Sequence, residues 1–479
     1  MPNPASGVAN HRRRHVGSTL SLSLGVAMVV TAASTAIAQD AGPPGYKLFR
    51  YDEDYRYLAK GAENGDFWDA IKYVPIGRDT PVYLSLGGEL RERVEYYSPF
   101  SFGLGRAPAD AYVLHRLLLH GDLHASEYFR AFLQFGSYFA ISKNNPAAPY
   151  EDRLDLQQAF VDFRLPLALP GDPMPTIRFG RQEIALGSQR IVAIRDAPNV
   201  HRNFDGFRLI ASMGNIRIDG LAVHPVFQNV GVFDNPSAWD QGLWGLYGTV
   251  LLGSRVGLDV YYLGFDNRRA AFAGSAGQET RHSIGARFSG GFSGFDWDWE
   301  ALWQFGTFAG RQIRAWTASS NSGYTFADVP WTPRIGLKAD IASGDETPGG
   351  STVGTFNALF PKLAYFNQAA LLAPANVVDI HPSVTVKPRK DLAITVGWDF
   401  LWRQTTQDAV YVAPFTAVPG TAGRGSAFIG HQIALEVTWQ LDRHITLEAS
   451  YVHFTVGDAL RAAGASDVDF AMFAATYKF

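Results

Sequence analysis

The sequence predicts an all-β fold, a transmembrane antiparallel β-barrel of about 18 strands with short periplasmic turns and long extracellular loops. Three observations support this prediction. Long stretches alternate between apolar and polar residues. Aromatic residues make up 13% of a chain whose mean hydropathy is close to zero. The connections between these stretches are short and long by turns along the chain, so that a short connection is usually followed by a long one. Together these features favour a wall with one face toward lipid and one toward water.

Residues 295–307 show the alternation most clearly. A soluble sandwich would turn the aromatic face of such a strand inward and its acids to water. Strands of about 11 to 15 residues also exceed the usual five or six of soluble sheets, and they suit a tilted membrane crossing. Phe295, Trp297, Trp299, Ala301, Trp303 and Phe305 share one face, and Asp296, Asp298, Glu300 and Gln304 share the other.

The same period-two pattern recurs along the chain and predicts the strands. Aromatic residues gather near predicted strand ends, where interface girdles are expected, at Tyr96, Tyr97, Tyr261, Tyr262 and Trp439. The predicted ranges are 82–97, 111–125, 127–140, 153–165, 176–186, 204–212, 215–224, 242–252, 255–265, 281–290, 294–308, 311–320, 332–343, 375–387, 391–405, 427–441, 443–455 and 467–479.

The connections give a signal that does not depend on hydropathy. Several even-numbered connections are very short, as at Ser126, Gly214 and Asp442, whereas odd-numbered ones such as 344–374 and 406–426 are long. Bacterial barrels have an even number of strands and pair short periplasmic turns with long extracellular loops. One odd-numbered connection, at Gly310, is short, so the count could differ by two.

Composition excludes several other classes of protein. The net charge of −3 does not fit a strongly basic nucleic-acid binder, and the absence of cysteine removes disulfide and thiol chemistry. No apolar run after residue 38 approaches the roughly 18 residues that a spanning helix needs.

The N-terminus predicts export. Residues 12–14 are arginines, residues 16–33 carry no charge, and the Ala-Ile-Ala run at 36–38 fits the small-residue rule for cleavage. The alternative is a single membrane anchor. We therefore expect a signal peptide over 1–38, a short periplasmic segment over 39–81 and an outer-membrane barrel over 82–479.

The last predicted strand places Phe473, Ala475, Tyr477 and Phe479 on one face. This pattern resembles the C-terminal signature that the outer-membrane assembly machinery recognises, so we expect that partner to engage Phe479. The apolar faces of the strands would contact outer-membrane lipid and lipopolysaccharide.

Six motifs resemble those of the alginate export family of outer-membrane barrels, and they span nearly the whole mature chain. This resemblance implies an 18-stranded monomeric barrel with an electropositive constriction, through which an anionic polysaccharide leaves the cell. The motifs are Asp-Tyr-Arg-Tyr-Leu at 54–58, Leu-Gly-Gly-Glu-Leu-Arg-Glu-Arg at 86–93, Leu-Gln-Gln-Ala-Phe at 156–160, Phe-Gly-Arg-Gln-Glu at 179–183, Arg-Asn-Phe-Asp-Gly at 202–206 and Gly-Thr-Phe-Asn at 354–357.

Arginine suits a wall that guides a polyuronate, because its planar fork binds carboxylates bidentately and stays charged. The alternative is that the arginines pair with wall acids, namely Glu89, Asp162, Asp340 or Asp399, and simply maintain a hydrated wall. The resemblance supports Arg91 and Arg181 best. The candidates for the lumen are Arg91, Arg93, Arg116, Arg130 and Arg403, with Arg178, Arg181, Arg208 and Arg334 less certainly oriented.

Two loops are candidates for a gate. Arg190, Arg195, Arg202 and Asp205 follow a Gly-Ser-Gln-Arg stretch, and they fit an inward gate and an ordinary surface loop equally well. The loop 344–374 is long and aromatic, which favours an inward constriction or cap.

The sequence contains no enzyme signature and predicts no cofactor or metal. His120 and His124 share a polar face but would lie about 13 Å apart, too far to share a metal. No Gly-x-Ser-x-Gly nucleophile elbow occurs.

The preferred function is export of an anionic polysaccharide, alginate or a relative, and the alternative is a porin selective for small organic anions or oligosaccharides. Long loops that block the lumen, with many arginines along its length, would favour export. A short constriction with few charges would favour the porin.

Overall fold

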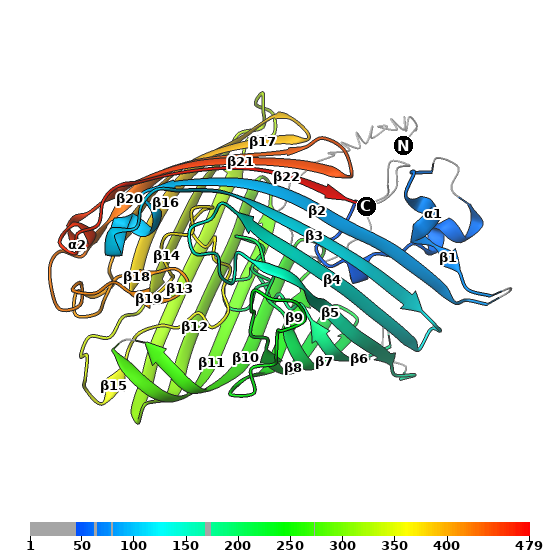
Figure 1. Cartoon of the computed structure of the whole chain (residues 1–479), viewed down its shortest axis with the longest axis horizontal. Helices are drawn as coiled ribbons and strands as arrows, with labels where there is room; N and C mark the ends of the chain where they lie inside the picture. The colour runs from blue at the N-terminus through cyan, green and yellow to red at the C-terminus, as the bar shows by residue number, and fades with distance from the viewer. Residues whose placement is uncertain (1–44, 62–64, 78–79, 168–173, 273) are drawn as a thin grey trace, which may run out of the picture. The chain divides into compact units, whose positions relative to one another are not determined.

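A computed structural model describes residues 45–61, 65–77, 80–167, 174–272 and 274–479. A sheet of twenty strands closes on itself; β1 and β15 are two residues long, and the other eighteen form the wall. Closure comes from antiparallel pairing of the first wall strand with the last, from Glu89 opposite Lys478 to Ser98 opposite Asp469. Figure 1 shows β2 beside β22 at this seam.

The wall strands pair antiparallel with their neighbours in chain order. They are β2 (Tyr83–Ser98), β3 (Asp110–His124), β4 (Phe129–Ile141), β5 (Asp152–Arg164), β6 (Thr176–Gln182), β7 (Phe204–Met213), β8 (Ile216–Pro225), β9 (Gln241–Leu251), β10 (Val256–Phe272), β11 (Ser275–Phe292), β12 (Phe295–Phe308), β13 (Arg311–Thr325), β14 (Arg334–Ala342), β16 (Val377–Arg389), β17 (Leu392–Trp402), β20 (Phe428–Gln440), β21 (Ile445–Val456) and β22 (Val468–Lys478).

The remaining elements are short. They are β1 (Val74–Pro75), β15 (Thr352–Val353), β18 (Tyr411–Val412), β19 (Thr416–Ala417), the helices α1 (Asp69–Lys72) and α2 (Asp458–Arg461), and the 3-10 helices η1 (Arg50–Asp52), η2 (Arg56–Lys60) and η3 (Phe100–Arg106). No helix in the described part of the chain is long and apolar enough to cross a membrane.

Side chains alternate between the two faces of the wall, and the exposed face is the apolar one. On β2, Leu90 and Val94 are 37% and 49% exposed on the outside, whereas Arg91 and Arg93 between them are 2% and 3% exposed inside the lumen. This is the reverse of a soluble protein and the arrangement of a membrane barrel. Each predicted range overlaps one wall strand, so the predicted fold class and strand count are confirmed.

One predicted loop is wrong. The ranges 255–265 and 281–290 leave 266–280 as a loop, but Asp266 to Phe272 pairs with Ser275 to Thr280, so β10 and β11 continue as a tall hairpin. The pairing register shifts between Asn267 and Ala270, and this irregularity interrupts the alternation from which the strands were predicted.

Part of the predicted girdle is also wrong. Tyr97 and Tyr261 are buried inside the barrel, where their hydroxyls donate to the Ala369 carbonyl oxygen and to Glu300. Neighbouring residues of a strand point to opposite faces, so only Tyr96 and Tyr262 of the two tyrosine pairs remain outside. Both are substantially exposed.

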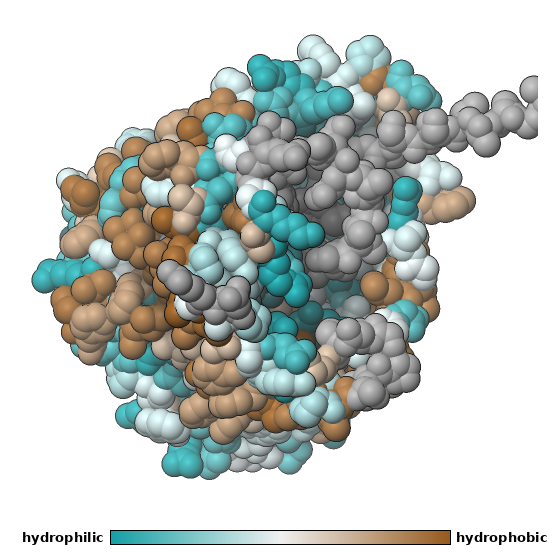
Figure 2. All heavy atoms as spheres, turned by 90° about the vertical axis from the view of Figure 1, so that its right-hand side faces the viewer, coloured by the Kyte–Doolittle hydropathy of each residue, from teal (hydrophilic) through white to brown (hydrophobic). Residues whose placement is uncertain are grey.

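The two ends of the barrel differ in their connections. One end, here the short-turn end, carries tight hairpins such as 214–215, 293–294 and 390–391. The opposite, long-loop end carries 183–203, 226–240, 343–376 and 403–427. Figure 2 shows the short-turn end, with hydrophilic side chains around its centre and hydrophobic ones on the left-hand flank of the wall.

The described residues before β2 lie at the short-turn end (Figure 1), and Tyr51 among them packs against Phe132 and Phe160 of the inner wall. Arg50 donates to the carbonyl oxygens of Gly88 and Phe479, both at 2.8 Å, and so holds the seam between β2 and β22. The Trp68 ring lies 4.4 Å from that of Phe479. The predicted signal peptide, 1–38, lies outside the described residues.

Candidate functional site in the lumen

Two loops fold from the long-loop end into the barrel: the first inward loop, 183–203, and the second inward loop, 343–376. They join at a short parallel bridge between Val192 and Phe360, where the Ala193 amide donates to the Phe360 carbonyl oxygen at 2.9 Å. The Phe360 ring packs edge-on against Phe204 of β7 and Phe265 of β10. The two loops therefore form one apolar unit with the wall, and the predicted inward placement of 344–374 agrees with the structure.

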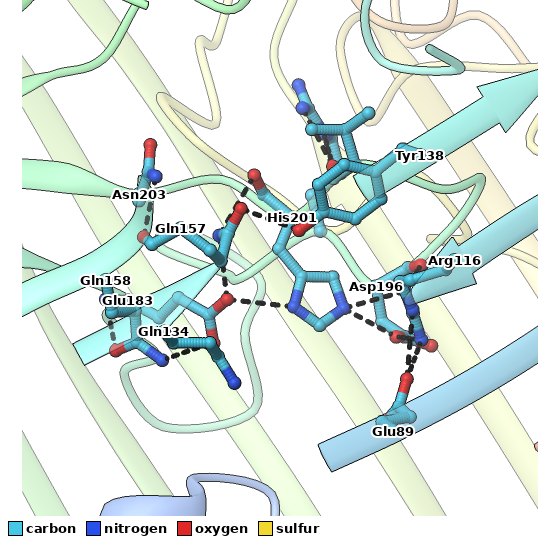
Figure 3. A network of polar contacts seen from close by, with 12 residues as sticks. Glu89, Arg116, Gln134, Tyr138, Gln157, Gln158, Glu183, Asp196, His201 and Asn203 are labelled. Carbon is cyan, nitrogen blue, oxygen red and sulfur yellow. Dashed lines mark hydrogen bonds and ion pairs between the residues drawn. The ribbon is translucent and has the colours of Figure 1, made fainter. Parts of the chain in front are cut away.

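An ion-pair network latches the first inward loop to the wall (Figure 3). Arg116 of β3 places Nη2 2.8 Å from Glu89 Oε1 on β2 and 2.7 Å from Asp196 Oδ1 on the loop. His201, five residues farther along the same loop, contacts both Asp196 and Glu183, the first residue of the loop, each at 2.9 Å. Arg116 is thus the wall residue that holds the second half of the loop, and His201 connects this contact to Glu183 at the start of the loop.

Amide side chains extend this network across β4 and β5. Gln157 donates to Glu183 at 2.8 Å and accepts from the Tyr138 hydroxyl at 2.7 Å. Asn203 donates to the Gln157 carbonyl oxygen at 2.8 Å. Most of these groups are buried, so their hydrogen bonds define a single position for the loop.

Protonation of His201 stabilises this position of the first inward loop. Burial and the nearby Arg116 lower the pKa of His201, but the carboxylates of Glu183 and Asp196 outweigh them, and its pKa lies above the ordinary value. A raised folded-state pKa means that the protonated ring stabilises the latch. That contribution is complete below the ordinary pKa of histidine and is lost as pH rises through the raised one.

Most of the predicted lumen arginines form ion pairs across neighbouring strands or loops. Arg116 and Arg178 pair with Glu89 and Asp162, two of the acids considered for a hydrated wall. The other wall pairs are Arg130 with Asp122, Arg208 with Asp219 and Arg334 with Asp296. Asp340 and Asp399 instead lie near Lys338 and Gln432, at 3.3 and 2.8 Å.

Three further arginines hold loops. Arg91 donates to the Pro198 carbonyl oxygen at 2.5 Å and approaches Asp196, both on the first inward loop. Arg93 pairs with Glu95 and donates to Gln368 of the second inward loop at 3.2 Å. Arg403 follows β17 and donates to five carbonyl oxygens of residues 406–426, so it shapes that loop.

The predicted positions of Arg181 in the lumen and of Asp205 in an inward gate are wrong. Both residues lie on the outer side of the wall. Arg181 shares the outer face of β6 with Phe179, which is 49% exposed, and Asp205 shares the face of β7 with Phe207. The two pair at 2.9 Å beneath the 226–240 loop, whose Ser237 and Asn235 contact them. Arg178 points into the lumen, and a side chain three residues later on a strand must point out.

The candidate gate residues of the first inward loop lie inside the barrel, not on its surface. Arg190 pairs with Asp298 and Glu300 of β12 at 2.8 and 3.0 Å. Arg195 donates to the Val200 carbonyl oxygen and to Gln228. Arg202 donates to the Pro361 carbonyl oxygen at 3.3 Å, with its guanidinium 5.2 Å from the Phe360 ring.

Two lysines of this region, Lys338 and Lys362, were not among the residues predicted for the lumen. Lys338 on β14 lies beside Asp340, which faces Asp379 across β14 and β16. Lys362, on the second inward loop, donates its amide to the Gln189 carbonyl oxygen of the first. A loop lysine carries no periodic signal, so only the folded loop reveals its position.

Lys362 gives the lumen a pH-dependent charge. Burial, with Lys338 and Arg190 nearby, lowers the pKa of Lys362 to about 8, so the ammonium is charged below that pH and neutral above it. We expect anion selectivity, measured as a reversal potential across a planar bilayer, to fall as pH rises through about 8. Lys362→Gln should lose this step, and Lys390→Gln, at a short-turn hairpin, should retain it. An unchanged step in Lys362→Gln would contradict the assignment.

Within the described ranges, no group of three or more His, Asp or Glu side chains is arranged to hold a metal ion. The contacts that the lumen does show are ion pairs and hydrogen bonds. Cations from the wall and the loops meet acids in a water-facing lumen, with an apolar outer face around them.

A closed barrel with a lipid-facing outer wall and a charged, loop-filled lumen defines an outer-membrane transport channel. The alginate export family model matches residues 82–474, and the chain belongs to that family. A comparison with curated proteins finds no match.

Several solved outer-membrane proteins share the fold. OccK11 (OpdR) of Pseudomonas aeruginosa is 12% identical, with 83% of this chain and 96% of that chain covered and a TM-score of 0.54. OccAB1 of Acinetobacter baumannii is 13% identical, with 82% and 96% covered and a TM-score of 0.54. OccK2 (OpdF) of P. aeruginosa, solved in complex with glucuronate, is 9% identical, with 83% and 98% covered and a TM-score of 0.54.

Proposed function

We propose that this channel exports an anionic polysaccharide, alginate or a relative, through a lumen that the two inward loops close at rest. One observation supports the proposal: the two loops that enter the lumen carry cations, and cations of the wall hold the first of them. Arg91 and Arg116 contribute from the wall, and Arg190, Arg202 and Lys362 from the loops. The protein itself would reach the outer membrane after removal of a signal peptide over 1–38, and residues 39–81 would remain at the periplasmic end of the barrel.

The latch offers a physical route by which a polyuronate could open the path. Arg91 and Arg116 both contact Asp196, whose side chain is 55% exposed to the lumen. A carboxylate of the polymer could replace that of Asp196 on the two guanidiniums, since both make the same charge-assisted hydrogen bonds. The loop would then lose one anchor as the polymer gains one, and each contact would stay weak enough for the chain to move on.

The test is single-channel conductance of the purified protein, titrated with polymannuronate and with a neutral polymer of similar size. We expect the anionic polymer to block the conductance and the neutral polymer to leave it unchanged. Arg91→Ala should weaken this block by about tenfold, the loss of one charge-assisted contact. Arg181→Ala is the matched control, because Arg181 is an ion-paired arginine of the same barrel on the outer side of the wall. Equal effects of the two changes, or no block at all, would exclude the proposed path.

The alternative is a porin for small organic anions, and a specific observation favours it. Arg130, Arg178 and Arg208 are paired with wall acids, so the exchangeable charge is confined to the short stretch around the loops. OccK2, whose barrel is similar to this one, was solved in complex with glucuronate, and this supports a small uronate as the solute. Conductance that ignores polymannuronate but responds to glucuronate would support this function.

We further propose that the barrel acts as a monomer in contact with outer-membrane lipid and lipopolysaccharide, and that the assembly machinery recognises Phe479. The exposed apolar belt of the outer wall supports the lipid contact. The packing of Phe479 beneath Trp68 supports a role for this residue after assembly as well.

A further inference from the structure

The wall has a lateral notch near the long-loop end, where β14 is shorter than β13. Pairing between the two strands ends at Thr317 and Ala342, yet β13 continues to Arg311. Beyond that point the two residues of β15 run parallel to β13, opposite Gln312 and Ile313. A cavity of about 280 Å³ remains between the upper part of β13, residues 343–354 and Gln404.

The notch opens on the outer face of the barrel. Arg314 and Trp316 line it, and they alternate with Ile313 and Ala315, which are buried inside. Trp303 of β12 lies directly across from Trp316 and is 47% exposed. Outward-facing indoles are typical of the aromatic belts at membrane interfaces, and Arg314 lies two residues nearer the long-loop end than Trp316.

The charges of the notch leave one cation available. Arg311 pairs with Asp345 at 2.8 Å and so neutralises one of the two acids that line the cavity. Arg314 is exposed and forms no ion pair with a described residue; the exposed Glu346 is the second lining acid. An outward arginine at the level of the head groups is positioned for an anion that the membrane itself supplies.

We propose that this notch binds the phosphate of an outer-leaflet lipid head group. Arg314 donates to two phosphate oxygens, which its planar fork matches, and the indoles of Trp303 and Trp316 contact the start of the acyl chains. Glu346 faces the cation or amine that accompanies the phosphate. This site is separate from the lumen and does not depend on what the channel transports.

The experiment uses the full chain purified in dodecyl maltoside, with dihexanoyl phosphatidic acid titrated by calorimetry. Wild-type protein should bind this lipid about tenfold more tightly than the phosphate-free dihexanoylglycerol, and Arg314→Gln should remove that preference. The matched control is Arg269→Gln, because Arg269 is an exposed arginine near the same end that already pairs with Asp240.

Three results would overturn the proposal. Arg314→Gln and Arg269→Gln could bind phosphatidic acid equally, so that Arg314 is not the ligand. Dihexanoylglycerol could bind as tightly as the phosphatidic acid, which would leave an apolar groove only. Inorganic phosphate could compete at the same concentration as the lipid, which would define a free-anion site. Unchanged heat-modifiable mobility of Arg314→Gln on a gel shows that the variant barrel is folded.

Discussion

Arg116→Met is expected to release the first inward loop and to raise the open probability of the channel. Arg116 is buried between Glu89 and Asp196, and its loss leaves these carboxylates without their main counter-charge. Because Asp196 is half-exposed, the lost loop contact is that of a charge-assisted hydrogen bond, about 1.5–3 kcal/mol, which would raise the occupancy of the open state by about 10-fold or more. The measurement is open probability in planar bilayers, together with swelling of proteoliposomes in a neutral sugar.

Arg208→Met is the matched control for this experiment. Arg208 is an equally buried arginine of the wall, but its partner is Asp219 of the neighbouring strand and not a loop residue. It should lower barrel stability without raising the open probability. If both variants open alike, the latch is not at Arg116 and the loop is held elsewhere.

Tyr51→Ala should free the N-terminal segment from the lumen at the short-turn end. The Tyr51 ring is 4% exposed, packs edge-on against Phe132 and Phe160, and lies 4.0 Å from the Arg178 guanidinium. Truncation of a buried aromatic side chain to alanine costs about 3–5 kcal/mol. The segment should therefore become sensitive to protease in the folded protein, and the thermal midpoint of the barrel should fall.

Tyr57→Ala is the control, because Tyr57 lies on the same segment and is 44% exposed. Protease should cut this variant no faster than wild type. Equal cutting of both variants would show that the buried contacts of Tyr51 do not hold the segment.

The alternation of residue types was enough to predict the wall. Along 295–308 every second side chain must meet lipid and the others must meet water, so the pattern itself encodes both the strand and its two faces. The closing strand and the alternation of short and long connections follow from the same rule. The prediction from alternation fails between Asn267 and Ala270. The pairing register shifts there, so the end of the β10–β11 hairpin was predicted as a loop.

The orientation of Arg178 and Arg181 was also within reach of the sequence. Two residues three positions apart on one strand cannot share a face, so only one of them could enter the lumen. The exposed Phe179 and Phe207 identify Arg181 as the outward one. The resemblance to the alginate export motifs had instead favoured a lumen position for Arg181.

The sequence by itself therefore determines the membrane, the barrel and the charged character of the lumen, because these depend on a local period that each strand repeats. Only the tertiary structure decides how the lumen is filled. Arg116 meets Asp196 and Arg190 meets Asp298 across 80 and 108 residues, and Val192 meets Phe360 across a greater separation. No periodic pattern encodes such contacts, since they form only once the wall has closed and the loops have packed inside it.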